Sequence, residues 1–163
     1  MKAQFFWLLG MVLTSTVSAV GQSKRGSIEG VWQATEVTHR GGPGGSMTLK
    51  PGPNLTIFSG THYTRVDVQT DKPRPVLANP ASATAEQLRE VWGPLVAEAG
   101  TYELAESRIT LRPTIAKNPA AMAPGVSIIY SYKLDGNSLT LTIERDQHGP
   151  VPDPFSVKLV RIE

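Results

Sequence analysis

The chain contains no cysteine among its 163 residues. Disulfide bonds, thiolate metal sites and cysteine nucleophiles are therefore excluded. So is the lipid-modified cysteine that anchors many exported proteins to a membrane. A fold built from this sequence has to be stabilised chiefly by a hydrophobic core, and a chain of this length is large enough to bury one.

A surplus of positive charge is also missing. Lysine and arginine together number 16, against 14 aspartate and glutamate residues. The longest basic run is Lys24-Arg25, and no aromatic residues alternate with basic ones. Nucleic-acid binding needs a concentrated positive surface, so a nucleic acid is not expected as a partner.

Long apolar runs are absent as well, because the longest one covers only Phe5 to Leu13. A membrane-spanning helix needs roughly 20 apolar residues. This run follows Lys2 and precedes the small residues Val17-Ser18-Ala19, an order typical of a secretory signal peptide. We predict a signal peptide over residues 1–19, a flexible leader over 20–27 and one domain over 28–163. The mature protein is expected in the periplasm or secreted, without a membrane anchor.

The domain is rich in short segments of alternating apolar and polar residues. Glycine and proline clusters separate these segments, and Asp135-Gly136-Asn137 is a hairpin signal. Eight or nine short strands in hairpin order are typical of an antiparallel sandwich or barrel. The strand signals cover residues 28–38, 47–50, 55–58, 62–70, 101–104, 108–115, 126–134, 138–144 and 155–162.

One helix interrupts the strand pattern. Thr84 and Gln87 have the spacing of a capping box, and apolar residues recur after them at helical spacing up to Val96. We predict an amphipathic helix over about residues 84–97. Pro94 is expected to kink or end it.

A glycine and two large side chains bear on the choice between sandwich and barrel. Gly30 and Trp32 lie on the first predicted strand, and Arg161 lies on the last. If the strands close into a barrel, these two strands are neighbours and Arg161 can stack on the Trp32 indole. The alternative is an ordinary core tryptophan and an exposed terminal arginine.

With these residues, the chain resembles bacterial exported proteins described as lipocalin-like domain proteins, from about Gly30 to Glu163. The resemblance implies a mostly β fold, an antiparallel meander closed into a lipocalin-like barrel of about 8–9 strands with one inserted helix. Typical lipocalins carry their helix near the C-terminus instead. The resemblance rests on Gly30-Val-Trp32, Lys72-Pro-Arg-Pro75, Trp92-Gly-Pro94, Gly100-Thr-Tyr-Glu-Leu104, Arg112-Pro113 with Ala116-Lys-Asn-Pro119, and Lys158-Leu-Val-Arg161.

Known catalytic motifs are missing. The sequence has no G-x-S-x-G, H-E-x-x-H or Walker motif, and its three histidines are scattered. We therefore predict no metal site, no cofactor and no catalytic residue. Asp67, Glu103 and Glu144 can meet across strands, but solvated neighbours on a sheet are the simpler interpretation.

The interior of the predicted barrel supplies the candidate ligand site. Aromatic rings and cations near a cavity suit a small, mainly apolar or amphipathic anionic molecule. Core packing of the tyrosines and solvation of the cations are the alternatives. The predicted ligand-binding residues are Trp92, Tyr102, Arg112, Tyr130 and Tyr132, with Arg74 and Lys117 as further cations.

Three functions remain open. The leading hypothesis is an extracytoplasmic binding protein for that small molecule. The second is a structural or interaction barrel with a filled core. The third is an isomerase or cyclase that uses Tyr and Arg to polarise a carbonyl, with Glu103 or Asp67 as base. This third function requires a buried carboxylate near a cavity.

Overall fold

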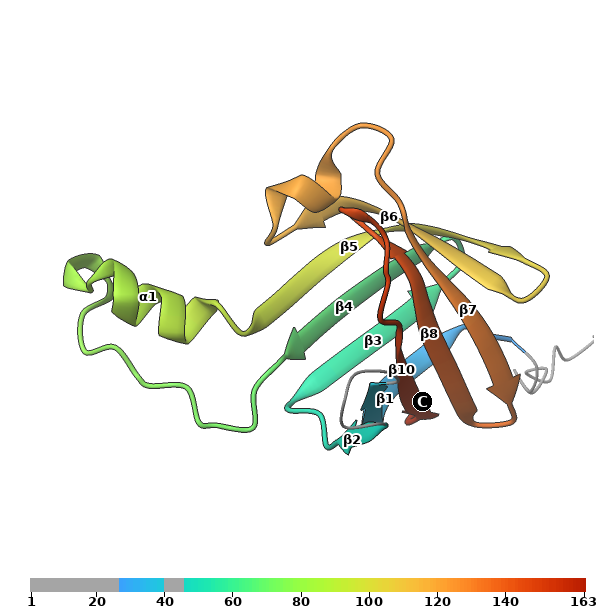
Figure 1. The fold of residues 1–163 in the computed structure, drawn as a ribbon, viewed down its shortest axis with the longest axis horizontal. Coiled ribbons are helices and arrows are strands. Elements are labelled where there is room, and N and C mark those ends of the chain that lie inside the picture. Colours follow the sequence, from blue (N-terminus) through green and yellow to red (C-terminus); the bar gives the residue numbers. More distant parts are fainter. Residues whose placement is uncertain (1–26, 40–45) are drawn as a thin grey trace, which may run out of the picture.

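The computed structural model describes residues 27–39 and 46–163. The predicted signal peptide and nearly all of the predicted leader lie outside these residues. Within them, ten antiparallel strands form one sheet (Figure 1). The strands are β1 (Gly30–His39), β2 (Met47–Leu49), β3 (Asn54–Ser59), β4 (His62–Val68), β5 (Leu95–Ala105), β6 (Arg108–Ala116), β7 (Ile128–Asp135), β8 (Ser138–Asp146), β9 (Gly149–Pro150) and β10 (Phe155–Arg161).

The sheet closes on itself because β10 pairs with β1 on one side and with β8 on the other. Eight strands therefore complete a barrel in the order β1, β3, β4, β5, β6, β7, β8 and β10. The short β2 and β9 are additions that pair with β1 and β8. The predicted closed antiparallel barrel is confirmed, and the sandwich alternative is excluded.

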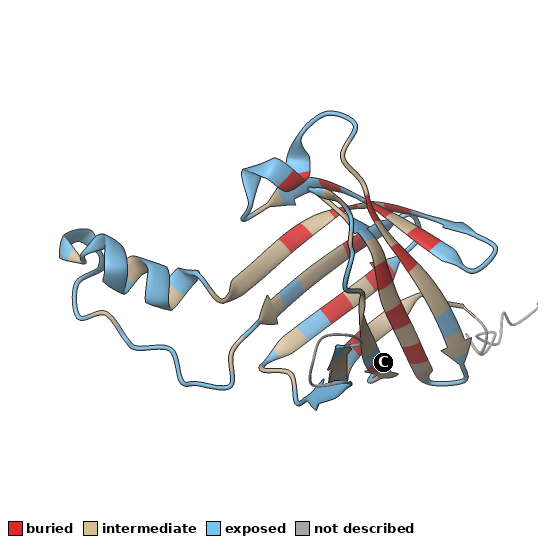
Figure 2. Cartoon of the chain, in the orientation of Figure 1, coloured by how far each residue is buried: buried red, intermediate tan, exposed pale blue. Residues whose placement is uncertain are grey.

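The core fills the inside of this barrel. Alternate residues of the eight barrel strands point inward, so the buried positions follow one another along these strands as separate patches (Figure 2). An eight-stranded barrel is just wide enough for such side chains to meet. The largest fully buried side chains are Trp32, Phe58, Ile109 and Leu139.

Trp32 and Arg161 close one end of the barrel. They are direct cross-strand partners, and the guanidinium carbon of Arg161 lies 4.2 Å from the centre of the indole ring. Arg161 also donates to the carbonyl oxygens of Glu29 and Ser27, the second at 2.6 Å. Gly30 has a φ of +137°, and a side chain there would collide with the Arg161 guanidinium.

The barrel wall has one interruption, on the β3 side of β1. Residues 30–32 of β1 pair with β3 and residues 37–39 pair with β2. Between them the side chain of Asn54 takes the place of a strand. Its Oδ1 accepts from the Ala34 N–H at 2.6 Å, and its Nδ2 donates to Ala34 O at 3.1 Å and to Gly52 O at 2.8 Å.

The helix α1 (Ala85–Trp92) begins as predicted and ends earlier. Thr84 and Gln87 form the reciprocal capping box, with bonds of 2.9 and 3.2 Å. The predicted continuation to residue 97 is wrong, because Leu95 and the residues after it belong to β5. Pro94 cannot continue a helical hydrogen-bond ladder, and the chain turns into the sheet after it.

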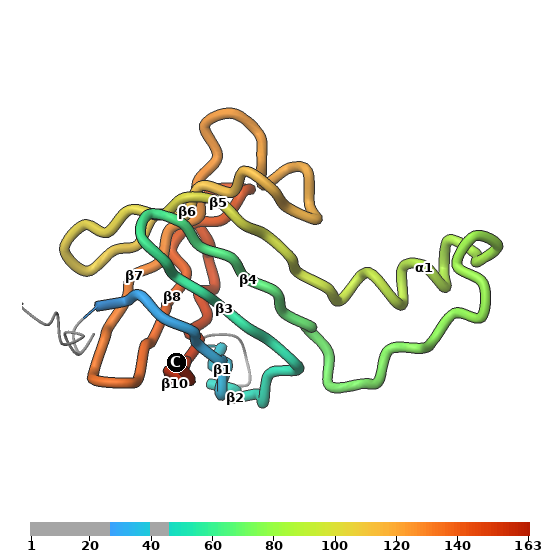
Figure 3. Tube along the Cα trace, turned by 180° about the vertical axis from the view of Figure 1, so that it is seen from behind, coloured from blue at the N-terminus to red at the C-terminus, as the bar shows by residue number. Residues whose placement is uncertain are grey.

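Residues 69–94 form an arm that stands away from the barrel (Figures 1 and 3). Besides α1 it contains the short 3-10 helix η1 (Pro80–Ser82), and neither helix has a buried residue. The arm leaves and rejoins the barrel at one neck, where Gln69 N–H donates to Pro94 O at 2.8 Å. No helix in the described part of the chain is long and apolar enough to cross a membrane.

Candidate functional site

A cluster of charged and phenolic side chains lies inside the barrel. On β4 the alternation that buries Tyr63 also turns Arg65 and Asp67 inward. Glu98 of β5 is the direct cross-strand partner of Arg65. Tyr130 reaches the same guanidinium from β7, which lies on the far side of β5 and β6. We call these five residues the Arg65 cluster.

Arg65 is the centre of the cluster. Its Nη1 donates to the Tyr130 phenol oxygen at 2.8 Å. Its Nε lies 3.1 Å from Asp67 Oδ2, and its Nη2 lies 3.7 Å from Glu98 Oε1. One guanidinium therefore faces two carboxylates and one phenol.

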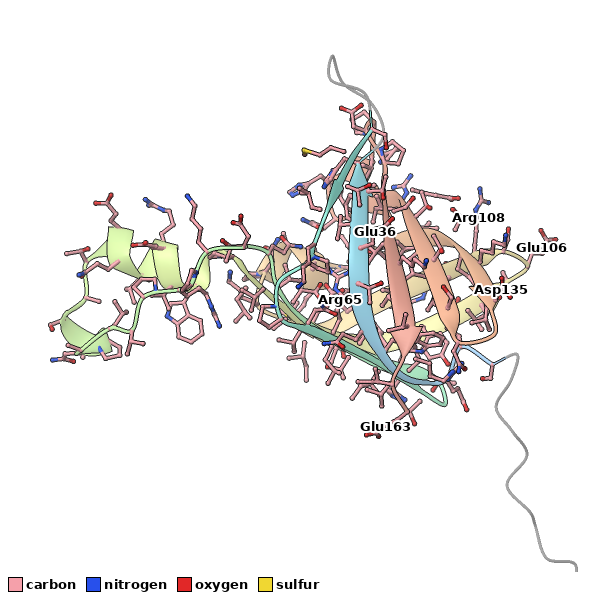
Figure 4. All side chains as sticks on the ribbon, turned by 90° about the horizontal axis from the view of Figure 1, so that it is seen from below. Glu36, Arg65, Glu106, Arg108, Asp135 and Glu163 are labelled. Atoms are coloured by element: carbon pink, nitrogen blue, oxygen red, sulfur yellow. The ribbon has the colours of Figure 1, made fainter. Side chains whose placement is uncertain are left out.

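The cluster has a deep side and an accessible side. The Glu98 side chain is only 5% exposed, whereas those of Arg65 and Asp67 are 21% and 23% exposed. Figure 4 labels Arg65 on the side of the barrel nearer the arm, while Glu106, Arg108 and Asp135 mark the far end. Arg65 and Asp67 therefore lie on the solvent side of the cluster, and Glu98 lies on its deep side.

Hydrogen bonding within the cluster is incomplete. Three buried atoms have no hydrogen-bond partner among the described residues: Tyr63 Oη, Arg65 Nε and Glu98 Oε1. Arg65 Nε forms an ion pair with Asp67, but the two groups are not aligned as a hydrogen bond. Buried polar atoms in native proteins are nearly always satisfied, and an exception calls for a bound water, ion or ligand, or for a functional role. The three atoms offer one phenol, one N–H donor and one carboxylate acceptor.

The charge state of the centre is well defined. Burial alone would favour the neutral guanidinium, but Tyr130, Glu98 and Asp67 together raise the pKa of Arg65 above its ordinary value. Arg65 therefore stays charged. Burial raises the pKa of Tyr63 strongly, and the neighbouring Glu98 raises it further. Tyr63 is thus a neutral phenol throughout the physiological range.

Asp67 and Tyr130 also have pKa values above their ordinary ones. Burial raises the pKa of Asp67, and Arg65 only partly opposes this effect. Burial raises the pKa of Tyr130 as well, again against the influence of Arg65. Perturbed titrating groups gathered in one accessible interior are typical of functional sites.

The cluster carries a net negative charge when both carboxylates are ionised. One guanidinium is opposed by Asp67 and Glu98, and the phenols add no charge. A third carboxylate entering the site would be repelled by the two already present. A hydroxyl or neutral amine would instead donate to Glu98 and accept from the Tyr63 phenol. An ammonium group would donate to both.

The three tyrosines predicted to bind a ligand lie inside the barrel but do not form one group. Tyr130 belongs to the Arg65 cluster. Tyr102 packs edge-on against Phe58, with ring centres 5.1 Å apart. Tyr132 is partly buried against the core. Of the three, Tyr130 alone has a hydrogen bond to the cluster.

Trp92 and Arg112, the other two predicted ligand residues, lie outside. Trp92 is half-exposed on the arm and does not cover the barrel. Arg112 points outward and pairs with Glu103 at 2.9 Å. Glu144 pairs with Arg108 at the same distance. The three carboxylates considered from the sequence thus do not meet, and among them Asp67 alone faces the interior cluster.

Sequence reasoning missed Arg65 and Glu98. Arg65 shares its side of β4 with Tyr63, but alternation alone places this charged side outward, because the β-branched residues lie on the other side. Glu98 was hidden because the predicted helix was extended to residue 97, which left no strand to place it on. In the structure, β5 begins at Leu95 and Glu98 is its fourth residue.

Within the described ranges, no group of three histidine, aspartate or glutamate residues is placed to hold a metal ion. The sequence matches no known protein family, and no curated protein is similar to it. A crystal structure of an uncharacterized protein from Bacteroides eggerthii is similar, with a TM-score of 0.44 and 10% identity over 82% of this chain and 98% of that one.

Proposed function

We propose that the protein binds a small amphipathic molecule, with the polar end of the ligand at the Arg65 cluster. The observation that supports the proposal is incomplete hydrogen bonding inside a closed barrel: Tyr63 Oη, Arg65 Nε and Glu98 Oε1 have no hydrogen-bond partner among the described residues, although the last two take part in ion pairs. Leaving a buried polar group unpaired costs about 1–3 kcal/mol. A ligand that satisfies these atoms would recover part of that cost.

The apolar residues around the Arg65 cluster suit the apolar end of such a ligand. Ligand sites in proteins are mainly apolar, with a few polar groups that fix orientation. Here Ile109 and Ile143 are the direct cross-strand partners of Tyr130, and Ile128 lies two residues before Tyr130 on β7; all three are almost fully buried. Because the core fills the barrel, an alkyl chain can enter beside the cluster only if these side chains move aside to open a cavity.

The charge of the cluster selects the kind of head group. Because carboxylates outnumber the guanidinium, we do not retain an anionic molecule for this site. A neutral hydroxyl or a cationic amine fits better. The remaining expectations from the sequence belong to the same proposal: a lipocalin-like relative, exported by the predicted signal peptide, that works outside the cytoplasm.

A set of three amphiphiles tests the proposal. Dodecylamine, dodecanol and dodecanoate have the same chain and differ only in the head group. Calorimetric titration at neutral pH and below the micellar range should give binding of the amine and the alcohol, and weaker binding of the carboxylate by about tenfold or more. Glu98→Gln should reduce this preference.

Glu103→Gln is the matched control, because it removes one carboxylate of β5 that points outward. It should leave the preference unchanged. If none of the three amphiphiles binds, the proposal fails. It also fails if Glu98→Gln and Glu103→Gln behave alike, because binding would then not involve the cluster.

A structural or interaction barrel is the second candidate. The observation in its favour is the arm, which holds Val76 at 96% exposure and Trp92 at 52%. Exposed apolar side chains mark a contact surface where they form a continuous patch, and this second function requires Val76 and Trp92 to belong to one. A protein that binds no amphiphile, yet loses Trp92 exposure on mixing with a partner, would favour this second function.

A further inference from the structure

A groove on the outside of the barrel is separate from the Arg65 cluster. One wall is residues 50–53, which lead into β3; the other is Val68, the last residue of β4, with residues 70–74 at the start of the arm. The groove has a volume of about 490 Å³ and is open to solvent. This volume is within the range of small-molecule sites.

The walls are held together by backbone contacts. Val68 N–H donates to Pro53 O at 2.9 Å. Gly52 sits so close to the other wall that a side chain there would collide with the carbonyl oxygens of Val68 and Thr70. Pro51 and Pro53 restrict the backbone on one side. The two walls therefore form a fixed frame.

Three cations line this frame and one carboxylate opposes them. Lys50, Lys72 and Arg74 line the groove together with Asp71, which leaves a local charge of +2. The whole chain has a formal charge of +2. None of these four residues takes part in the ion pairs found among residues 27–39 and 46–163. The positive charge of the groove is therefore available to a ligand.

The cations on the arm are also partly positioned. Lys72 N–H donates to Thr70 Oγ1 at 3.1 Å, which fixes the turn that carries Lys72. Arg74 Nη1 donates to Val91 O at 3.3 Å, so one edge of its guanidinium is anchored to α1. The other nitrogens of that guanidinium remain for an oxyanion, which arginine binds through paired hydrogen bonds.

We propose that this groove binds a multiply charged oxyanion, a phosphate- or sulfate-bearing small molecule. Lys50, Lys72 and Arg74 would bind its oxygens, and the proline-lined walls would contact the rest of it. The site is distinct from the proposed amphiphile site, because no residue of the Arg65 cluster lines the groove. The segment involved, Lys72-Pro73-Arg74-Pro75, has no role in the barrel itself.

The test uses inorganic pyrophosphate and sulfate with the whole protein, followed by backbone amide NMR and calorimetry at fixed ionic strength. Saturable binding of pyrophosphate is expected, with amide shifts confined to residues 50–53 and 68–74. The variant Lys72→Gln/Arg74→Gln should weaken it by at least about tenfold, and Asp71→Asn should strengthen it. Stronger binding of sulfate than of pyrophosphate would assign the site to sulfated ligands.

The control variant is Lys133→Gln/Lys158→Gln, which removes two exposed cations elsewhere on the barrel. It should change pyrophosphate binding by less than about twofold. Equal losses in the two double variants, shifts spread over the whole surface, or no saturation at millimolar pyrophosphate would overturn the proposal. Glu98→Gln should not affect pyrophosphate binding, so the two proposed sites can fail separately.

Discussion

Arg65 on β4 and Tyr130 on β7 meet across the inside of the barrel, with the guanidinium Nη1 2.8 Å from the phenol oxygen. Their strands are not neighbours, since β5 and β6 lie between them. The hydrogen bond thus joins two walls through the interior, where apolar contacts hold most of the core. Charge inside a barrel has consequences for stability that can be measured.

Replacing Arg65 by methionine should destabilise the protein strongly at neutral pH. Asp67 and Glu98 would lose their cation inside the barrel, and breaking a buried ion pair costs about 3–5 kcal/mol. Urea unfolding measures this loss. Arg112→Met, which breaks a surface pair with Glu103, should cost about 0–1 kcal/mol. Equal losses would mean that the interior cluster contributes no more than a surface pair.

Asp67 should make the protein less stable as pH rises from acid toward neutral. The raised pKa means that the folded protein keeps the Asp67 proton at pH values where the unfolded chain has released it. Stability then falls as pH increases through a window that starts near the ordinary value of 3.8 and ends at the folded pKa. Urea midpoints measured across this window in Asp67→Asn should show a smaller fall than in the wild type.

Glu103→Gln is the control for the pH series, because its carboxylate lies outside the barrel. Its midpoints should follow the wild-type curve. An Asp67→Asn curve that also follows the wild type would show that Asp67 titrates normally in the folded protein.

The buried phenols should cause alkaline unfolding. Tyr63 and Tyr130 keep their protons in the folded state above pH 10, the ordinary value at which unfolded phenols lose theirs, so stability falls as pH rises past it. Tyr63→Phe should raise the alkaline midpoint seen by circular dichroism. At neutral pH it should cost little, because the Tyr63 hydroxyl has no hydrogen-bond partner among the described residues. A Tyr63→Phe midpoint equal to the wild type would contradict this account.

Arg161→Met should loosen the end of the barrel that Trp32 closes. The variant loses the stacked guanidinium and the hydrogen bonds to Ser27 and Glu29. We expect a loss of about 1–3 kcal/mol in urea unfolding and a red shift of tryptophan fluorescence as water reaches the indole. Arg161→Lys keeps the charge but not the planar fork, and should lie between methionine and the wild type.

The arm should be dispensable for folding. Val68 and Leu95 are direct partners at the neck, so Thr70 and Gly93 can be joined by a short Asn-Gly turn. Because α1 buries no residue, the shortened chain should keep its strand content and melt within about 3 °C of the wild type. Failure of the shortened protein to fold would show that the arm supports the barrel.

Strand alternation and turn chemistry were sufficient to predict most of the fold. The hairpin at Asp135-Gly136-Asn137 and the capping box at Thr84 lie where the sequence placed them. The end of the helix was mispredicted for a physical reason. Leu95 and Val96 fit helical spacing, but pairing with Val68 and Asp67 of β4 places them in a strand. That pairing is a tertiary contact, which local spacing does not reveal.

The Arg65 cluster could not be predicted because it reverses the usual rule for a half-buried strand. Alternation alone would turn the β-branched face of β4 inward and its charged face outward. In the structure Val66 is 45% exposed, while Arg65 and Asp67 point into the barrel. Glu98 and Tyr130, on other strands, compensate the buried charge. Only the assembled barrel brings those partners together.

The side-chain amide of Asn54, which fills the gap beside β1, restricts the choice of expression host for this protein. Asn54-Leu55-Thr56 has the form of an N-glycosylation sequon. In the folded barrel, both hydrogens of Asn54 Nδ2 are already committed to Ala34 O and Gly52 O. A glycan attached there during secretion from a eukaryotic cell would remove one of these bonds and place a sugar against the wall. Expression in such a host therefore calls for an inhibitor of N-glycosylation, because a glycosylated chain would be expected to leave the wall open at this point.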